Sequence, residues 1–141
     1  MSSKYDMRIN ELFAGGADWE WIGRTRSLSK AKFTVEDQDY EVWFAGDLHA
    51  VHIGFMWKRD EKYSMGTTGT GNAAQVMSTV IAIIKSFVDE TQPPEFYFSG
   101  NGASRVRLYT RMATRLASMA PGYTMTSYDE GDARNWSFTR K

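Results

Sequence analysis

Apolar residues follow two different spacings along this chain, and each spacing predicts a different kind of element. Residues 73–88 carry the longest helical pattern, because apolar positions three and four apart there form one broad face. Residues 105–120 repeat that spacing, with Ser104 expected as the N-cap and a Pro-Gly pair expected to close the helix. A third, shorter helix is predicted over 6–14.

Strict alternation of apolar and polar residues occupies most of the remaining sequence and predicts half-buried strands. The alternating runs are 19–22, 33–35, 40–44, 51–57, 95–99, 123–128 and 136–139, with a weaker run at 63–65. We expect the first meander turn at 37–39 and the hairpin turn of the last two strands at 129–132. The order is therefore helix, meander, helix, strand, helix and hairpin. One α+β domain over residues 1–141 fits this order best.

The composition of the chain makes several classes of function unlikely. The chain has 141 residues, with 17 basic and 17 acidic side chains, so net charge makes a nucleic-acid partner unlikely. It has no cysteine, which excludes disulfides and a thiolate nucleophile, and no carboxylate cluster lies beside its two histidines, so we expect no metal site. We find no apolar run of membrane-spanning length and no apolar signal core, and we expect a cytoplasmic protein without a membrane partner.

A glycine-threonine loop at 66–71 leads directly into the helical pattern of 73–88. Small residues at the start of a helix leave backbone N–H groups uncovered, and the helix dipole makes that end attractive to anions such as phosphate. Taken alone, this feature has a more common explanation, which is a tight turn with a helix cap.

Two motifs resemble the GNAT superfamily of acyl-CoA-dependent N-acetyltransferases. The first is Gly69-Thr70-Gly71-Asn72-Ala73, which is similar to the family's pyrophosphate loop, Gln/Arg-x-x-Gly-x-Gly/Ala. The second is similar to Asn-x-x-Ala-x-x-x-Leu-Tyr, and its four positions are Asn101, Ser104, Leu108 and Tyr109. The resemblance covers roughly residues 51–128. The arginine-bearing second motif also looks like that of small GNAT-like proteins of tailed bacteriophages.

The resemblance implies a GNAT-like domain with a central, mostly antiparallel mixed sheet flanked by helices. It implies acetyl-CoA as cofactor, with an unknown amine as acceptor, and Tyr109 as the general acid for the departing thiolate. The cofactor contacts that it implies are Thr68, Gly69, Thr70, Gly71, Asn72, Ala73, Asn101 and Ser104. The sequence departs from the family at Gly66, where the loop normally begins with Gln or Arg. It departs again at Gly122-Tyr123, because the family's Gly-Phe comes sooner after the tyrosine.

Charge is unevenly placed although its sum is zero. Residues 101–120 contain Arg105, Arg107, Arg111 and Arg115 and no acid, and the last three repeat every four residues along one helix face. This stripe could contact the 3′-phosphate of coenzyme A, an acidic partner or nucleic acid, or it could be a solvated face. Among the acids of the meander, Glu41 lies inside a strand, and we consider it as a candidate to orient the amine and accept its proton.

Two functions follow from these observations. The first is an N-acetyltransferase that moves an acetyl group to a primary amine of a protein or small molecule. The alternative is a catalytically silent GNAT-fold protein that binds a protein partner through the arginine-bearing helix 105–120. The high aromatic content fits a homodimer interface as well as it fits a large core.

Overall fold

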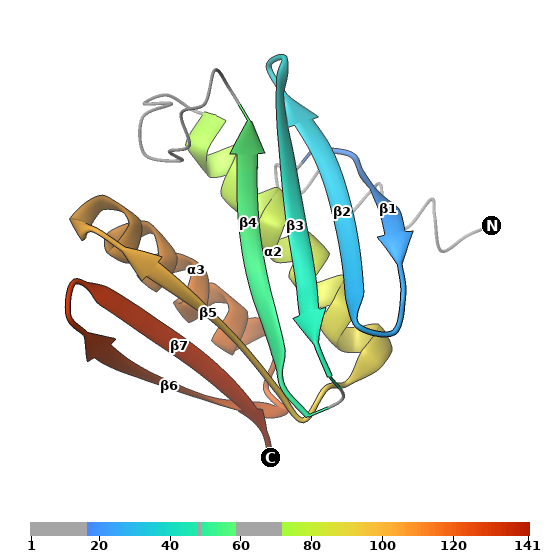
Figure 1. Ribbon diagram of the computed structural model, residues 1–141. Coiled ribbons are helices and arrows are strands. Elements are labelled where there is room, and N and C mark those ends of the chain that lie inside the picture. Colours follow the sequence, from blue (N-terminus) through green and yellow to red (C-terminus); the bar gives the residue numbers. More distant parts are fainter. Residues whose placement is uncertain (1–16, 48, 59–71) are drawn as a thin grey trace.

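The computed structural model describes residues 17–47, 49–58 and 72–141. They form one seven-stranded mixed sheet of order β1-β2-β3-β4-β5-β7-β6, and two helices lie behind it in Figure 1. The elements are β1 (Trp19–Arg24), β2 (Leu28–Val35), β3 (Gln38–Gly46), β4 (Val51–Lys58), α2 (Asn72–Thr91), β5 (Glu95–Asn101), α3 (Ala103–Met119), β6 (Tyr123–Glu130) and β7 (Ala133–Arg140). All neighbouring strands are antiparallel except β4 and β5. The expected α+β class is confirmed. The helix predicted over 6–14 and the strand predicted over 63–65 lie outside the described residues.

The meander β1–β4 follows the predicted alternation, but its first turn is tighter than predicted. Glu36 and Asp37 both have positive φ, 49° and 67°, and they join β2 to β3 as a two-residue turn. Gln38 therefore already pairs with Val35 and belongs to β3. A primed turn of two residues matches the right-handed twist of the strands, and acidic side chains at positive φ are uncommon but tolerated.

One face of the sheet holds the core. Along β2 and β3 every second side chain is buried, and these buried positions pair across the strands, as Phe33 does with Tyr40. Helix α2 packs against this face, where the ring of Phe87 stacks on that of Phe44 with centroids 4.1 Å apart. The apolar stripe predicted over 73–88 is confirmed, because the buried positions of α2 include Val76, Val80, Ile81, Ile84 and Val88.

Helix α3 begins earlier than predicted. Strand β5 continues through Asn101, which pairs with Ala133 of β7, and Gly102 turns the chain at φ 92° into a helix that starts at Ala103. Gly102 is the N-cap and provides no side-chain hydrogen bond, so the prediction of Ser104 as N-cap is wrong. Only a glycine adopts that positive φ without strain, which allows strand and helix to follow each other with no longer loop.

The two strands that run parallel, β4 and β5, stay paired over a short distance. Their pairing consists of Val51 with Phe96 and His52 with Tyr97. Beyond these residues the strands separate, as Figure 1 shows, although β4 continues to Lys58 and β5 to Asn101. A wedge-shaped separation therefore opens in the sheet, with its closed end at Val51. No helix in the described part of the chain has the length and hydropathy needed to cross a membrane.

Candidate functional site

Tyr109 lies beneath the separation of β4 and β5. Its ring contacts Phe55 of β4 with centroids 5.2 Å apart and Phe98 of β5 with centroids 6.0 Å apart. Trp136 of β7 lies on a third side, at 6.1 Å. The ring therefore touches both of the strands that part, and only 5% of the residue is exposed. Position 109 falls on the sheet-facing stripe of α3, together with Met112, Ala113 and Leu116.

Burial changes the acidity of this tyrosine. Desolvation by the surrounding aromatic residues raises the pKa of Tyr109 to about 12, against a smaller lowering by the charge of Arg105. The phenol therefore keeps its proton at neutral pH. The raised pKa also makes the phenol a weaker acid than an exposed tyrosine, and the role of proton donor that the resemblance implied for Tyr109 stays a prediction.

Asn101 and Ser104 lie at the start of α3, on either side of the turn at Gly102. Asn101 is the last residue of β5, Ser104 is the second residue of the helix, and both are exposed. The first turn of α3 contains no acidic residue, and neither does that of α2. Both helix N-termini therefore keep the electropositive character that favours an anionic ligand.

The predicted pyrophosphate loop is described only at its end. Thr68, Gly69, Thr70 and Gly71 lie outside the described residues. Asn72 is the first residue of α2, and Ala73 follows it as a half-buried residue of the first turn. The start of the long helix is thus where the sequence predicted it.

A groove of about 610 Å³ lies between α2 and α3. The first two turns of α2 form one wall, and α3 forms the opposite wall. The lining residues are Ala73, Ala74, Met77, Ser78, Leu108, Thr110, Arg111, Thr114 and Arg115. Sequence reasoning identified Ala73, Arg111 and Arg115. It missed the rest of the α2 wall, because the pairing of two helix faces is not visible in either helix alone. The volume falls within the range of small-molecule sites, about 300–1,000 Å³.

Glu41 is on the opposite face of the sheet. Its neighbours in β3, Tyr40 and Val42, are buried on the helix-covered face, so Glu41 points away from α2 and α3. Its partners in register are Lys32 and Met56. The structure therefore does not bring Glu41 and Tyr109 to the same side of the sheet.

The same open face carries a residue that sequence reasoning had set aside. His52 stacks on Tyr97 with ring centroids 5.0 Å apart and planes 8° apart. This is the last residue pair before β4 and β5 separate, so an exposed imidazole stands at the closed end of the separation. The described residues contain no group of three or more His, Cys, Asp or Glu side chains that could hold a metal ion.

Comparison with known proteins gives one family. Searches of curated proteins and of solved structures found no match. A family model described as "Family of unknown function (DUF6934)" matches residues 45–140. The matched segment is more than half of the chain and includes the separating strands, both helices of the groove and Tyr109. The chain therefore belongs to this family of unknown function.

Proposed function

We propose that the protein is a GNAT-like N-acetyltransferase that uses acetyl-CoA and acetylates a primary amine. The observation that carries this proposal is the parting of β4 and β5 after two residue pairs, with the buried phenol of Tyr109 beneath the opening. Strand edges that have lost their partners offer N–H and C=O groups to an extended ligand with amide groups of its own, as in β-strand addition. Such a ligand would pass close to a protonated tyrosine.

The residues of the groove fit coenzyme A. Its phosphates are anionic, and Arg111 and Arg115 present two guanidinium groups on one wall, which suit phosphate oxygens in charge and geometry. Ala73 and Ala74 leave the start of α2 uncrowded, where the helix dipole favours an anion. Bound acetyl-CoA supplies an acetyl group already activated as a thioester.

The chain's own residues would position the reactants and move protons. Tyr109 Oη would donate its proton to the departing sulfur, and the rings of Phe55 and Phe98 would limit water around it. The amine would approach from the open face, because helices cover the other one. There Glu41, or His52 at the closed end of the separation, would accept the amine's proton, directly or through water. The absence of cysteine fits direct transfer and a reducing compartment such as the cytoplasm.

The test is coenzyme binding followed by turnover. Saturating acetyl-CoA should raise the Tm of the full chain by several degrees, and free thiol should appear when a panel of primary amines, including a lysine peptide, is added. Tyr109→Phe should keep the Tm shift and lower the rate about a hundredfold or more. Tyr128→Phe is the matched control, because that side chain is 59% exposed on β6. A folded protein with no Tm shift would refute the proposal.

A second function is favoured by the surface of α3. Arg107, Arg111 and Arg115 are exposed and form no ion pair within the described ranges of the chain. An arginine-rich, acid-free helix face is suited to an acidic protein partner. If acetyl-CoA produces no Tm shift, this binding function, without catalysis, becomes the better proposal.

A further inference from the structure

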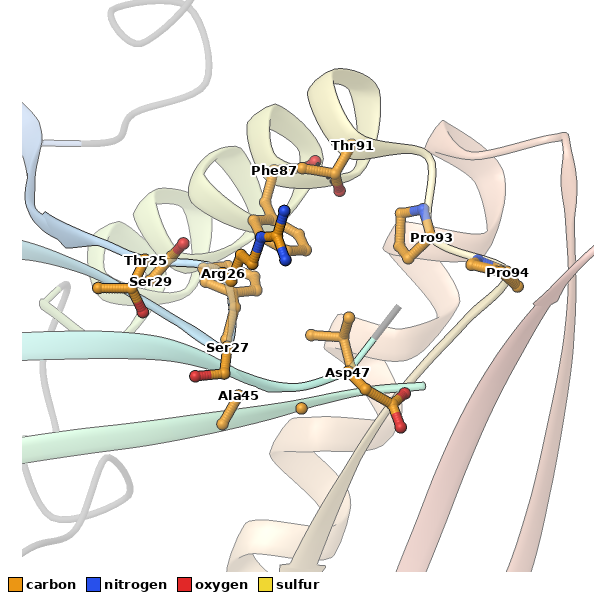
Figure 2. Close-up of a pocket in the computed structure, with 13 residues that line it drawn as sticks. Thr25, Arg26, Ser27, Ser29, Ala45, Asp47, Phe87, Thr91, Pro93 and Pro94 are labelled. Carbon is orange, nitrogen blue, oxygen red and sulfur yellow. Dashed lines mark hydrogen bonds between the residues drawn. The ribbon is translucent and has the colours of Figure 1, made fainter. Parts of the chain in front are cut away.

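A second cavity lies at the closed end of the β4–β5 pair, where Val51 is one of its walls. Its volume is about 290 Å³. Three chain connections surround it (Figure 2): the β1–β2 turn, the β3–β4 turn, and the Pro93–Pro94 link from α2 to β5. None of the residues assigned above to acetyl transfer lines this cavity. It is therefore a separate site.

The inner wall of the cavity is apolar. Phe44, Val51, Phe87 and Pro93 line it, and all four are buried. The stacked rings of Phe44 and Phe87 make this wall rigid, because each is held by its own strand or helix. A ligand's apolar part would be removed from water here, which favours binding.

Arg26 is the positively charged residue among the described residues that line the cavity. It lies in the β1–β2 turn, and Figure 2 shows its side chain running towards Phe87 and Thr91 of α2. The neighbouring Arg24 is paired with Glu90 at 2.9 Å, whereas Arg26 forms no ion pair among the described residues. A guanidinium beside an apolar wall is a recognition element for a carboxylate, which it binds with two parallel hydrogen bonds.

The acid at the rim has a structural role. Oδ1 of Asp47 accepts hydrogen bonds from the backbone N–H groups of His49 (2.8 Å) and Ala50 (3.2 Å), which lowers the pKa of this carboxyl group. Figure 2 shows its carboxylate directed away from Arg26 and Phe87. Asp47 thus caps the β3–β4 turn and does not neutralise Arg26.

Ser29 is the polar residue on the core-facing side of β2. The next core-facing residues of β2 are Ala31, Phe33 and Val35, yet Ser29 is only 6% exposed and lines the cavity. Its hydroxyl makes no hydrogen bond with another described residue, whereas the hydroxyls of Thr25 and Thr91 are bonded to backbone carbonyls. The Ser29 hydroxyl is therefore available as a second polar contact for a ligand in the cavity.

We propose that this cavity binds a small monocarboxylate with an apolar body. The carboxylate pairs with Arg26, the Ser29 hydroxyl donates a hydrogen bond to the same ligand, and the body packs on Phe44 and Phe87. A dianionic phosphate is disfavoured because the described lining offers one guanidinium for two negative charges, and the negative end of α2, which ends at Thr91, lies beside it. The volume of about 290 Å³ lies just below the usual range for small-molecule sites, which suits a small ligand.

The probe for this site is 3-phenylpropionate, followed by amide chemical shifts of the full chain. We expect saturable shifts at Ser27, Gly46 and Val51 with a Kd on the order of 1 mM, as for other fragments of this size. The neutral isostere 3-phenylpropionamide should bind roughly tenfold more weakly or not at all, because it loses the charge-assisted pair. Inorganic phosphate should produce no saturable shifts at these amides.

Three variants test the assignment. Arg26→Gln should reduce affinity roughly tenfold, whereas Arg107→Gln, which alters an exposed arginine outside both cavities, should leave it unchanged. Ser29→Val adds apolar volume at the cavity wall and should also block the probe while Arg26 remains. Equal binding of acid and amide, unaltered binding by Arg26→Gln in a folded variant, or no saturable shift in the native chain would each overturn the proposal. Because acetyl-CoA plays no part in these measurements, they are independent of the acetyltransferase test.

Discussion

Gly100 of β5 lies directly against the ring of Tyr109 of α3. A Cβ atom on residue 100 would be 2.7 Å from Cδ2 of Tyr109 and 3.3 Å from Cε2. Real Cβ atoms do not approach carbon so closely, so the ring can occupy this position only because residue 100 has no side chain. The contact fixes the candidate proton donor against the strand that leaves the β4–β5 pair.

The first prediction concerns this contact. Gly100→Ala should lower the free energy of unfolding by about 1–3 kcal/mol, because the ring is held by Phe55, Phe98 and Trp136 and cannot move without disturbing them. Urea denaturation measures the change. Gly122→Ala is the matched control, since a Cβ there meets nothing within 4 Å.

A double-mutant cycle with Tyr109→Leu identifies the cause. The cost of Gly100→Ala should shrink in the Tyr109→Leu background, because the ring that clashes is gone. An unchanged cost there would mean that the alanine acts through the strand and not through Tyr109.

The second prediction is an alkaline loss of stability. Tyr109 has a folded-state pKa of about 12, above the value of 10 for an unburied tyrosine, so folding favours its protonated form. This contribution is complete below pH 10 and is lost as pH rises towards 12, with a total of about 2–3 kcal/mol. Tyr109→Phe should therefore lose less stability than the native protein over that range, as measured by urea denaturation at several pH values. Tyr128→Phe should follow the native curve, and identical curves for all three proteins would contradict the assignment.

The third prediction concerns the join between β6 and the link from α2 to β5. The hydroxyl of Tyr123 donates a hydrogen bond of 2.7 Å to the backbone carbonyl of Pro93, and both residues are buried. Tyr123→Phe should cost about 1–3 kcal/mol in the free energy of unfolding, because the Pro93 carbonyl loses its partner away from water. Tyr128→Phe on the same strand should change stability by less than about 0.5 kcal/mol. Equal effects of the two variants in chemical denaturation would count against a structural role for the Tyr123 bond.

Most elements were predictable because their signals are local. Alternation in β2 and β3 identified which side chains share a face, and the spacing of apolar residues identified the sheet-facing side of α2 and the burial of Tyr109. The sequence signals were weaker at the ends of helices and strands. The turn at Glu36–Asp37 and the start of α3 at Ala103 depend on backbone conformations that acidic residues and glycine permit but do not require.

The candidate site was predictable only in part. The spacing of Asn101, Ser104 and Tyr109 indicated the helix that forms one wall of the groove, and the four-residue repeat indicated Arg111 and Arg115 in that wall. Glu41 seemed a reasonable partner because it lies inside a strand, but the pleat turns it to the face opposite Tyr109. His52 was dismissed because its position at the end of the β4–β5 pairing cannot be seen in the sequence.

By itself, the sequence determined which residues form helices and strands and which side of each element is apolar, because those properties repeat within a few residues. The tertiary structure alone decided that β7 enters between β5 and β6, that both helices cover one face, and that β4 and β5 part after His52 and Tyr97. It also decided that Arg26 of the β1–β2 turn and Phe87 of α2 line the same cavity. These relationships join residues far apart in the chain, and they arise from packing apolar faces against one another, which no single stretch of sequence encodes.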